Sequence, residues 1–312
     1  MRLSVVVVNW NSREDLAACL ESLQAQTHDD LETIVVDNGS TDGSAQMVRD
    51  RFPRCKLLAE TENLGFAEAC NRGIVASTGP WVAMLNNDAV AEPDWAEALM
   101  KAAAEAPDNC GMLQSLMLFM QRRDTINSIG IDLLRTGRGH DRYEGLRREA
   151  ARKAEEIFCP TAGAAAYRRA MLDSIKLQTG WFDRTHFMYY EDLDLGWRAR
   201  LNGWTAKFVP ESVVFHRYHG SSDRHGRPWM LVISRTNRLR TMVKNASLRM
   251  LARSAHHSLY DVAVVLWNGG LKSGVKLAEA LQVSVRERRE VNAMVKERRR
   301  GVERRWVKRK RV

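Results

Sequence analysis

The chain has 312 residues and a formal net charge of +10, long enough for one large hydrophobic core or two modest ones. Hydrophobic residues make up 45% and charged residues 28% of it, which is typical of a soluble globular protein and excludes a disordered chain. No apolar run approaches the roughly 20 residues of a membrane-spanning helix. The five cysteines are scattered without a C-x-x-C pair, which argues against a disulfide framework or a zinc site. We therefore expect a cytoplasmic protein, and no signal peptide because an apolar strand starts at Leu3.

The positive charge is concentrated near the C-terminus. Residues 229–312 contain 21 Lys and Arg against 6 Asp and Glu, a net charge of +15, while residues 1–228 contain 27 against 32, a net charge of −5. A basic region on a slightly acidic body predicts contact with an anionic surface, either a membrane or a nucleic acid.

The first 90 residues alternate between short apolar strands and amphipathic helices. Strands are predicted over 3–8, 33–36, 56–58 and 82–85, and helical spacing of apolar residues falls between them. This alternation predicts an α/β fold with a mostly parallel, doubly wound sheet and helices on both faces. We expect residues 136–153, which are rich in Arg, Gly and Glu, to form a mobile loop over the site.

Polar residues follow three of these strands and are expected at one edge of the sheet, where open α/β sheets bind ligands. Asp37 is suited to accept hydrogen bonds from a base or ribose, with Asn9 and Asn11 framing the same pocket. The alternative is that Asp37 only caps the following helix through the Ser40–Thr41 turn. Neither G-x-G-x-x-G after the first strand nor G-x-x-x-x-G-K-[ST] occurs, which argues against a dinucleotide-binding fold and a P-loop enzyme.

The third cluster, Asn86-Asn87-Asp88, ends the apolar strand 82–85. Amide and carboxylate oxygens suit Mg²⁺ or Mn²⁺ together with phosphate oxygens. The alternative is a polar turn that precedes the helix after Pro93.

Four motifs together resemble a known family. They are Val5–Ser12 (VVVVNWNS), Val35–Gly43 (VVDNGSTDG), Asn63–Gly73 (NLGFAEACNRG) and Leu85–Ala89 (LNNDA). In this order they resemble the inverting glycosyltransferase family 2, in its bacterial rhamnosyltransferase-like branch, over about residues 3–220.

The resemblance implies a GT-A fold, one Rossmann-like domain that binds a nucleotide-sugar and a divalent metal, Mg²⁺ or Mn²⁺. Asn86-Asn87-Asp88 stands where many members have D-x-D, so Asp88 is the expected metal ligand and Asn86 replaces the first Asp. We expect the donor to contact Asn9, Asn11, Asp37, Asn63, Gly65, Asn71, Asn86, Asn87, Gly163 and Trp181. Gly163 belongs to the small-residue stretch 159–166, and Trp181 replaces the second glycine of the family's Gly-Gly-Phe-Asp motif.

Three acidic residues within four positions follow an aromatic run near residue 190. Inverting sugar transfer needs a group that takes the proton of the acceptor hydroxyl. Glu191-Asp192 matches the family's Glu-Asp pair, and we assign Asp192 as the base, with Glu191 as the second choice or an orienting partner. Asp194 is four residues before Arg198, which favours a structural ion pair.

Two histidines follow the last predicted strand, 212–215. The family often places a histidine here that reaches the metal or the diphosphate. His216 is our first choice and His219 the second.

We therefore expect a catalytic domain over residues 1–227 and a basic, amphipathic helical region over 228–312. The expected reaction transfers a sugar, rhamnose as the first choice, from a dTDP-, UDP- or GDP-sugar to a lipid-linked or surface glycan. The basic region predicts peripheral attachment to the inner face of the cell membrane. A nucleic-acid-binding protein, a dimer surface and a non-catalytic glycan binder are the alternatives, although no nucleic-acid-binding module is present in the sequence and we expect no such partner.

Overall fold

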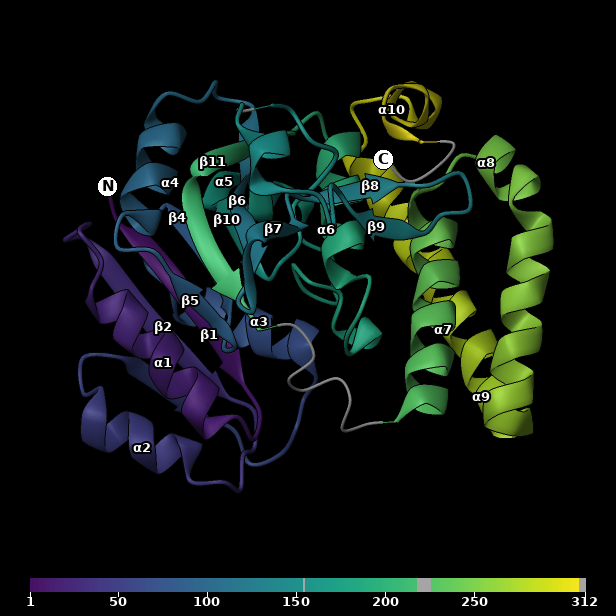
Figure 1. The fold of residues 1–312 in the computed structure, drawn as a ribbon. Coiled ribbons are helices and arrows are strands. Elements are labelled where there is room, and N and C mark those ends of the chain that lie inside the picture. The colour runs from purple at the N-terminus through teal and green to yellow at the C-terminus, as the bar shows by residue number, and fades with distance from the viewer. Residues whose placement is uncertain (154, 218–225, 309–312) are drawn as a thin grey trace.

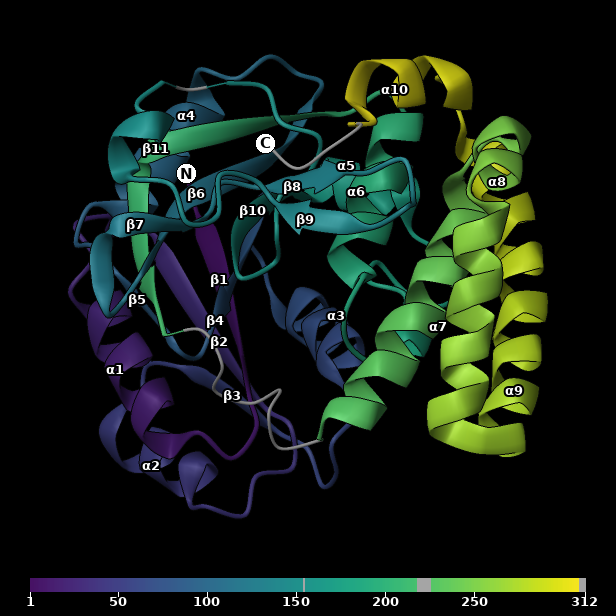
Figure 2. The ribbon, with the colours of Figure 1, turned by 45° about the vertical axis from the view of Figure 1, so that its right-hand side comes forward.

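The computed structural model describes residues 1–153, 155–217 and 226–308. A large sheet with helices on both faces forms most of the molecule, and a group of long helices lies beside it (Figures 1 and 2). The strands are β1 Leu3–Asn9, β2 Leu31–Asp37, β3 Lys56–Ala59, β4 Trp81–Asn86, β5 Ala89–Ala91, β6 Cys110–Phe119, β7 Arg122–Ser128, β8 Ile131–Leu133, β9 Gly139–Asp141, β10 Ala164–Arg168 and β11 Thr205–His216. The helices are α1 Arg13–Gln24, α2 Ser44–Arg51, α3 Phe66–Ala76, α4 Trp95–Ala104, α5 Arg169–Ile175, α6 Glu191–Leu201, α7 Arg227–Asn245, α8 Leu248–Arg253, α9 Ala255–Met294 and α10 Arg299–Trp306, with 3₁₀ turns η1 Arg148–Ala151 and η2 Arg184–His186.

The sheet has the order β3-β2-β1-β4-β10-β6-β11-β5, with β7 paired to β6. Strands β1 to β4 are parallel, as predicted, whereas β10 runs antiparallel to both β4 and β6, so the whole sheet is mixed. The register places Asn9 beside Asp37 and Val8 beside Asn86, which confirms that the polar strand ends gather at one edge.

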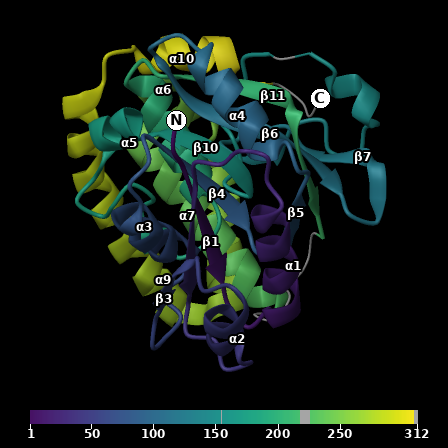
Figure 3. The ribbon, with the colours of Figure 1, turned by 90° about the vertical axis from the view of Figure 1, so that its left-hand side faces the viewer.

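Two hydrophobic cores hold the helices against the two faces of the sheet (Figure 3). One contains α1, α2 and α4, and the other contains α3, α5 and α6. Odd residues of β1 such as Val5 and Val7 lie in the first core and Val6 lies in the second, because side chains alternate across a strand. The long apolar strands therefore pack on both faces, which fixes their register and the position of their polar ends.

The segment that we expected to be a mobile loop is more regular than predicted. Strands β8 and β9 pair as a two-stranded sheet, and η1 follows within the same stretch. Backbone hydrogen bonds between β8 and β9 order this part of the chain, although its composition, rich in Arg, Gly and Glu, predicted a loop.

The basic C-terminal region packs against the rest of the chain. Met242 of α7, Val291 of α9 and Val302 of α10 belong to the same core as α3, α5 and α6. Helix α9 bends back on itself at Gly270, whose φ of 64° suits glycine. Across the described residues, none of the helices combines the length and apolarity needed to cross a membrane.

Candidate active site

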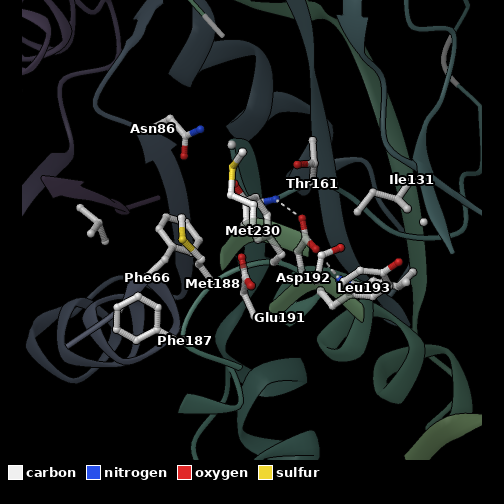
Figure 4. A pocket seen from close by; sticks show the side chains of 18 of the residues that line it. Phe66, Asn86, Ile131, Thr161, Phe187, Met188, Glu191, Asp192, Leu193 and Met230 are labelled. Atoms are coloured by element: carbon white, nitrogen blue, oxygen red, sulfur yellow. Dashed lines mark hydrogen bonds between the residues drawn. The ribbon is translucent and has the colours of Figure 1, made fainter. Parts of the chain in front are cut away.

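A cavity of about 630 Å³ lies at the carboxyl ends of β1 and β4. Its other walls come from the start of α6, the β8–β9 hairpin and the first turns of α7. Glu191 and Asp192 point into it, and Asn86 lies across from them (Figure 4). The topology thus brings together the strand-end cluster and the acidic pair, which are more than a hundred residues apart in sequence.

Three of the residues that we expected to contact the sugar donor do not line the cavity and instead stabilise this edge of the sheet. Asn9 is fully buried, donates to Asp37 Oδ1 at 3.0 Å and accepts from Asn87 Nδ2 at 2.7 Å. Asp37 also accepts from the Ser40 backbone N–H at 3.2 Å, which is the turn interaction considered from sequence. Asn11 accepts from the Thr41 backbone N–H at 2.7 Å. These three residues do not line the cavity, whereas Asn87 does.

The loop before α3 forms the floor near Asn63 and Gly65, which both line the cavity. Asn38, which sequence reasoning missed, joins them by donating to Asn63 Oδ1 at 2.9 Å and accepting from the Leu64 backbone N–H at 2.9 Å. Gly65 has φ +83°, and a Cβ there would lie 2.8 Å from the Phe187 carbonyl oxygen. The close approach of two backbones explains why this position needs glycine.

Asp88 and His216 form the pair that can hold a cation. His216 Nδ1 lies 2.9 Å from Asn127 Oδ1, and an amide oxygen only accepts, so Nδ1 carries the proton in the neutral ring. His216 Nε2 then presents a lone pair 3.0 Å from Asp88 Oδ1 and 3.1 Å from Asn86 Nδ2. Asp88 Oδ1 and His216 Nε2 are therefore close enough to bind the same cation.

This donor set fits Mg²⁺ or Mn²⁺. Among the residues that the structure describes, no group of three or more His, Cys, Asp or Glu side chains is arranged to hold a metal. Mg²⁺ is usually held by one or two carboxylates and takes its other ligands from substrate phosphates and water. His219, the second choice, lies outside the described residues.

Glu191 and Asp192 differ in their surroundings although they are neighbours at the start of α6. Asp192 accepts from the Leu193 backbone N–H at 2.7 Å and from the Ala162 backbone N–H at 3.3 Å. Glu191 is 6% exposed, and its Oε2 has no hydrogen-bond partner in the described chain. Burial raises the pKa of both carboxyls, and that of Glu191 is raised well above its usual value by burial and by the Asp192 charge. The pair therefore ionises first at Asp192, the residue with the hydrogen bonds.

The segment that leads into this pair has an unusual backbone. Phe187, Tyr189 and Tyr190 all have positive φ angles, of 62°, 68° and 74°. Such angles are costly for non-glycine residues and persist only where neighbours fix them. Asn237 of α7 does so, because its side-chain amide lies 2.7 to 3.0 Å from the carbonyl oxygens of His186, Met188 and Tyr189.

We expect Asn237→Leu to destabilise the protein by about 2 kcal/mol, because it leaves buried carbonyl groups without a donor. The loop also carries Asp192 into the cavity, so kcat should fall about ten-fold while the affinity for the donor is kept. Thermal denaturation and steady-state kinetics measure both effects. Asn268→Leu, at an exposed amide on α9, is the matched control, and an equal loss there would contradict the assigned role.

Asn71 and Trp181, which we also expected to contact the sugar donor, do not line the cavity. Asn71 instead bonds to the backbone of residues 181–182. Asn71 Oδ1 accepts from the Trp181 and Phe182 backbone N–H groups, and Asn71 Nδ2 donates to the Phe182 carbonyl at 2.8 Å. Trp181 is 7% exposed, and Lys176 Nζ lies 4.0 Å from its ring centroid. Gly163 lines the cavity, and its carbonyl accepts from the Asn86 backbone N–H at 2.9 Å.

Sequence reasoning missed several residues that line the cavity. The most informative is Asp141 of β9, because burial raises its pKa to about 6 and Asp192 adds to the shift. Met230 and Ser234 of α7 also line it, so the C-terminal region completes the site. No local motif marks these positions, and only the packing of α7 and β9 brings them here.

A buried ionic network lies behind the acidic pair. Asp194 and Arg198 form the predicted ion pair at 2.9 Å, fully buried. Lys244 of α7 also contacts Asp194, at 3.1 Å, and it bonds Asp183 and lies 3.5 Å from Glu287 of α9. The network therefore joins α6 to the C-terminal helices.

Comparison with known proteins gives consistent matches. The family model described as Glycosyl transferase family 2 matches residues 4–176. Over 253 residues the chain is 30% identical to the N-acetylglucosaminyl-diphospho-decaprenol L-rhamnosyltransferase of Mycobacterium tuberculosis, which covers 71% of this chain and 78% of that protein.

Solved structures show the same fold at lower identity. A mannosyltransferase from Pyrobaculum calidifontis, in complex with GDP-Man and Mn²⁺, superposes with a TM-score of 0.55 at 18% identity, over 94% of this chain and 85% of that one. TarS 1–349 of S. aureus, in complex with UDP-GlcNAc, gives a TM-score of 0.56 at 17% identity, over 95% and 84%.

Proposed function

The chain belongs to glycosyltransferase family 2, and we propose that it is an inverting, metal-dependent transferase of GT-A fold that uses a nucleoside-diphosphate sugar. The observation that carries this proposal is the arrangement of one cavity. On one wall Asp192 is the more readily ionised member of a buried acidic pair, and on the opposite side Asp88 Oδ1 lies 3.0 Å from His216 Nε2, two atoms that would hold a cation.

In the proposed reaction, Asp192 accepts the proton of an acceptor hydroxyl as that oxygen attacks the anomeric carbon. The bond from the anomeric carbon to the diphosphate oxygen breaks with inversion, and the nucleoside diphosphate leaves with the electron pair. Asp88 and His216 would hold a divalent cation, which when bound stabilises the charge of the leaving diphosphate. The loop 187–190 and Asn237 keep Asp192 in place.

The donor and acceptor are proposed by similarity. The mycobacterial relative is named as a rhamnosyltransferase acting on a decaprenol-linked sugar, and two solved structures of the same fold hold GDP-Man and UDP-GlcNAc. We therefore propose dTDP-rhamnose as the first donor, with UDP- and GDP-sugars as the alternatives, and a lipid-linked or surface glycan as the acceptor. The predicted donor residues Asn63, Gly65, Asn86, Asn87 and Gly163, which line the cavity, remain the proposed contacts.

A lipid-linked acceptor implies that the enzyme works at a membrane surface. We propose that it is cytoplasmic and attached peripherally to the inner face of the membrane through the C-terminal region, residues 228–312.

The donor site is tested by thermal-shift measurements with UDP-, GDP- and dTDP-sugars, with and without Mn²⁺ or Mg²⁺. We expect a metal-dependent rise in Tm for one nucleotide class, because a bound ligand stabilises the folded state, and loss of that rise in Asp88→Ala. Asp108→Ala, at an exposed carboxylate that does not line the cavity, is the control and should keep the shift. If no nucleotide shifts the Tm under any condition, the proposed function is wrong.

A further inference from the structure

A second cavity, of about 830 Å³, lies among α8, the start of α9, α10 and the turn between β8 and β9. It is lined by five arginines and two histidines, namely Arg135, Arg249, Arg253, Arg300, Arg304, His256 and His257. None of these arginines has an ion-pair partner within the described chain. The one acidic residue of the lining, Glu303, already accepts from the Ser247 backbone N–H and hydroxyl, both at 2.6 Å. This basic pocket is therefore suited to anionic groups such as phosphates.

An apolar face continues from the basic pocket along the first half of α9. Leu259, Tyr260, Leu266 and Trp267 follow His256 at helical spacing, so all lie on one side of the helix. Leu259 is 70% exposed and Trp267 90%, and Leu271 at the bend is 81% exposed. The opposite side of the helix, with Asp261 and Val265, is buried. We call the exposed side the apolar face of α9, and it consists of Leu259, Tyr260, Leu266, Trp267 and Leu271.

The charges beside the apolar face are all positive. Between Asp261 and Glu279 the only charged residues are Lys272 and Lys276, both exposed. Asp261 itself is fully buried in ion pairs with Arg235 and Arg238. Trp306 of α10 does not extend this face, because it packs on Phe158 with ring centroids 6.1 Å apart.

We propose that the basic pocket and the apolar face of α9 together dock on a bilayer of anionic lipids. Lipid phosphates would occupy the basic pocket, and Trp267, Leu271 and Leu259 would enter the interface between headgroups and acyl chains. The cations would contact the anionic headgroups, and the exposed apolar side chains would contact the acyl chains below them. This inference refines the membrane attachment put forward under the proposed function and rests on it.

Other occupants fit the observations less well. A two-fold dimer through the apolar face would cover it but would offer the arginines no anion, because the one acidic residue of the pocket lining, Glu303, is already bonded to Ser247. A nucleic acid would satisfy the arginines but would leave Trp267 and Leu271 in water.

The β8–β9 hairpin connects this surface with the active site. Arg135 and Thr136 in its turn line the basic pocket, while Gly139, His140 and Asp141 line the catalytic cavity. Lipid binding at the turn would therefore act on a wall of the catalytic cavity.

The test is co-sedimentation of the full chain with vesicles of phosphatidylcholine, alone or with about one third phosphatidylglycerol. We expect binding only to the anionic vesicles, weakened by high salt. Arg249→Ala/Arg253→Ala/Arg304→Ala should lower the partition coefficient about one hundred-fold, and Trp267→Ser/Leu271→Ser about ten-fold or more. Matched controls are Arg49→Ala/Arg54→Ala/Lys101→Ala, which removes the same charge elsewhere, and Val75→Ser, at another exposed apolar side chain. Both controls should bind as the unchanged protein does.

Three results would overturn the inference. An equal loss of vesicle binding in the control triple variant would mean that net charge alone drives binding. Equal binding to both vesicle types would exclude the basic pocket as a site for anionic lipids. A change from dimer to monomer in Trp267→Ser/Leu271→Ser, with vesicle binding kept, would make a second copy the occupant. Vesicle binding is measured without any donor, so its failure is distinct from failure of the nucleotide thermal shift.

Discussion

Asp192→Asn is expected to lower kcat for sugar transfer by about 1,000-fold while the protein still folds and binds its donor. The substitution keeps the shape of the side chain and an oxygen that can accept a backbone hydrogen bond from Leu193 or Ala162. It removes the group that takes the proton of the acceptor hydroxyl. The measurement is release of nucleoside diphosphate from the donor that the thermal-shift screen selects, in the presence of acceptor.

Glu191→Gln is the matched comparison. Burial and the Asp192 charge raise the pKa of Glu191 well above its usual value, so this side chain keeps its proton more readily than Asp192 does, and an amide resembles the protonated form. We expect a change in kcat of less than about ten-fold. A loss as large as that of Asp192→Asn would transfer the role of base to Glu191.

The pH profile gives an independent check of the same assignment. A base must be deprotonated, and burial raises the pKa of Asp192 above that of an ordinary aspartate. The acid limb of kcat/KM should therefore lie at a higher pH than an exposed aspartate would give, with activity lost as the pH falls. Asp141, with a pKa raised to about 6, faces the same cavity, so Asp141→Asn should shift this limb to lower pH by removing a nearby negative charge.

How much of this site the sequence could predict depends on where each residue lies. Asn86 and His216 end strands and Asp88 lies in the turn directly after β4, so hydrophobic patterning located the strands and thereby placed these residues at one sheet edge. The Glu191-Asp192 pair came from a family motif, and the structure puts it in the same cavity. The fold class and the parallel β1–β4 unit were predicted correctly for the same reason.

The remaining residues depend on long-range packing. Asn237 lies in a helix with no motif, and its role depends on three carbonyl groups about fifty residues away in the sequence. The basic composition of the C-terminal region predicted a surface for anions. It did not reveal that Arg238, Arg240 and Lys244 are buried, because charge alone does not distinguish a solvated face from a buried ionic network.

Lys244→Met is expected to destabilise the protein by about 3–5 kcal/mol, a larger effect than that of an exposed substitution. Lys244 is fully buried and contacts Asp183, Asp194 and Glu287, which are themselves at most 2% exposed. Methionine fills a similar volume but removes the positive charge that lies beside these three carboxyl groups. Thermal or denaturant unfolding measures the loss, and Lys101→Met at an exposed site is the control.

The pH dependence of this loss has a definite sign. Lys244 helps to hold the pKa of Asp183 far below its usual value and that of Asp194 at about 2, so both are charged at neutral pH in the unchanged protein. Groups with a lowered folded-state pKa contribute stability above their unfolded pKa and lose it as the pH falls through the folded value. Without Lys244 the buried carboxyls take up protons more readily, so the destabilisation of the variant relative to the unchanged protein should become smaller as the pH falls from 7 towards 5.

A second substitution separates the charge effect from the packing effect. Glu287 already has a pKa raised to about 7 by burial, so it is the carboxyl most easily neutralised. Lys244→Met/Glu287→Gln should recover part of the stability lost in Lys244→Met, most of all above pH 7, where Glu287 would otherwise carry an uncompensated charge. If the double variant is as unstable as the sum of the single variants, the lysine acts by filling space and the network is not electrostatic. Partial recovery would show that charges on α7 and α9 hold the helix that carries Asp192, and that the C-terminal region is part of the catalytic structure.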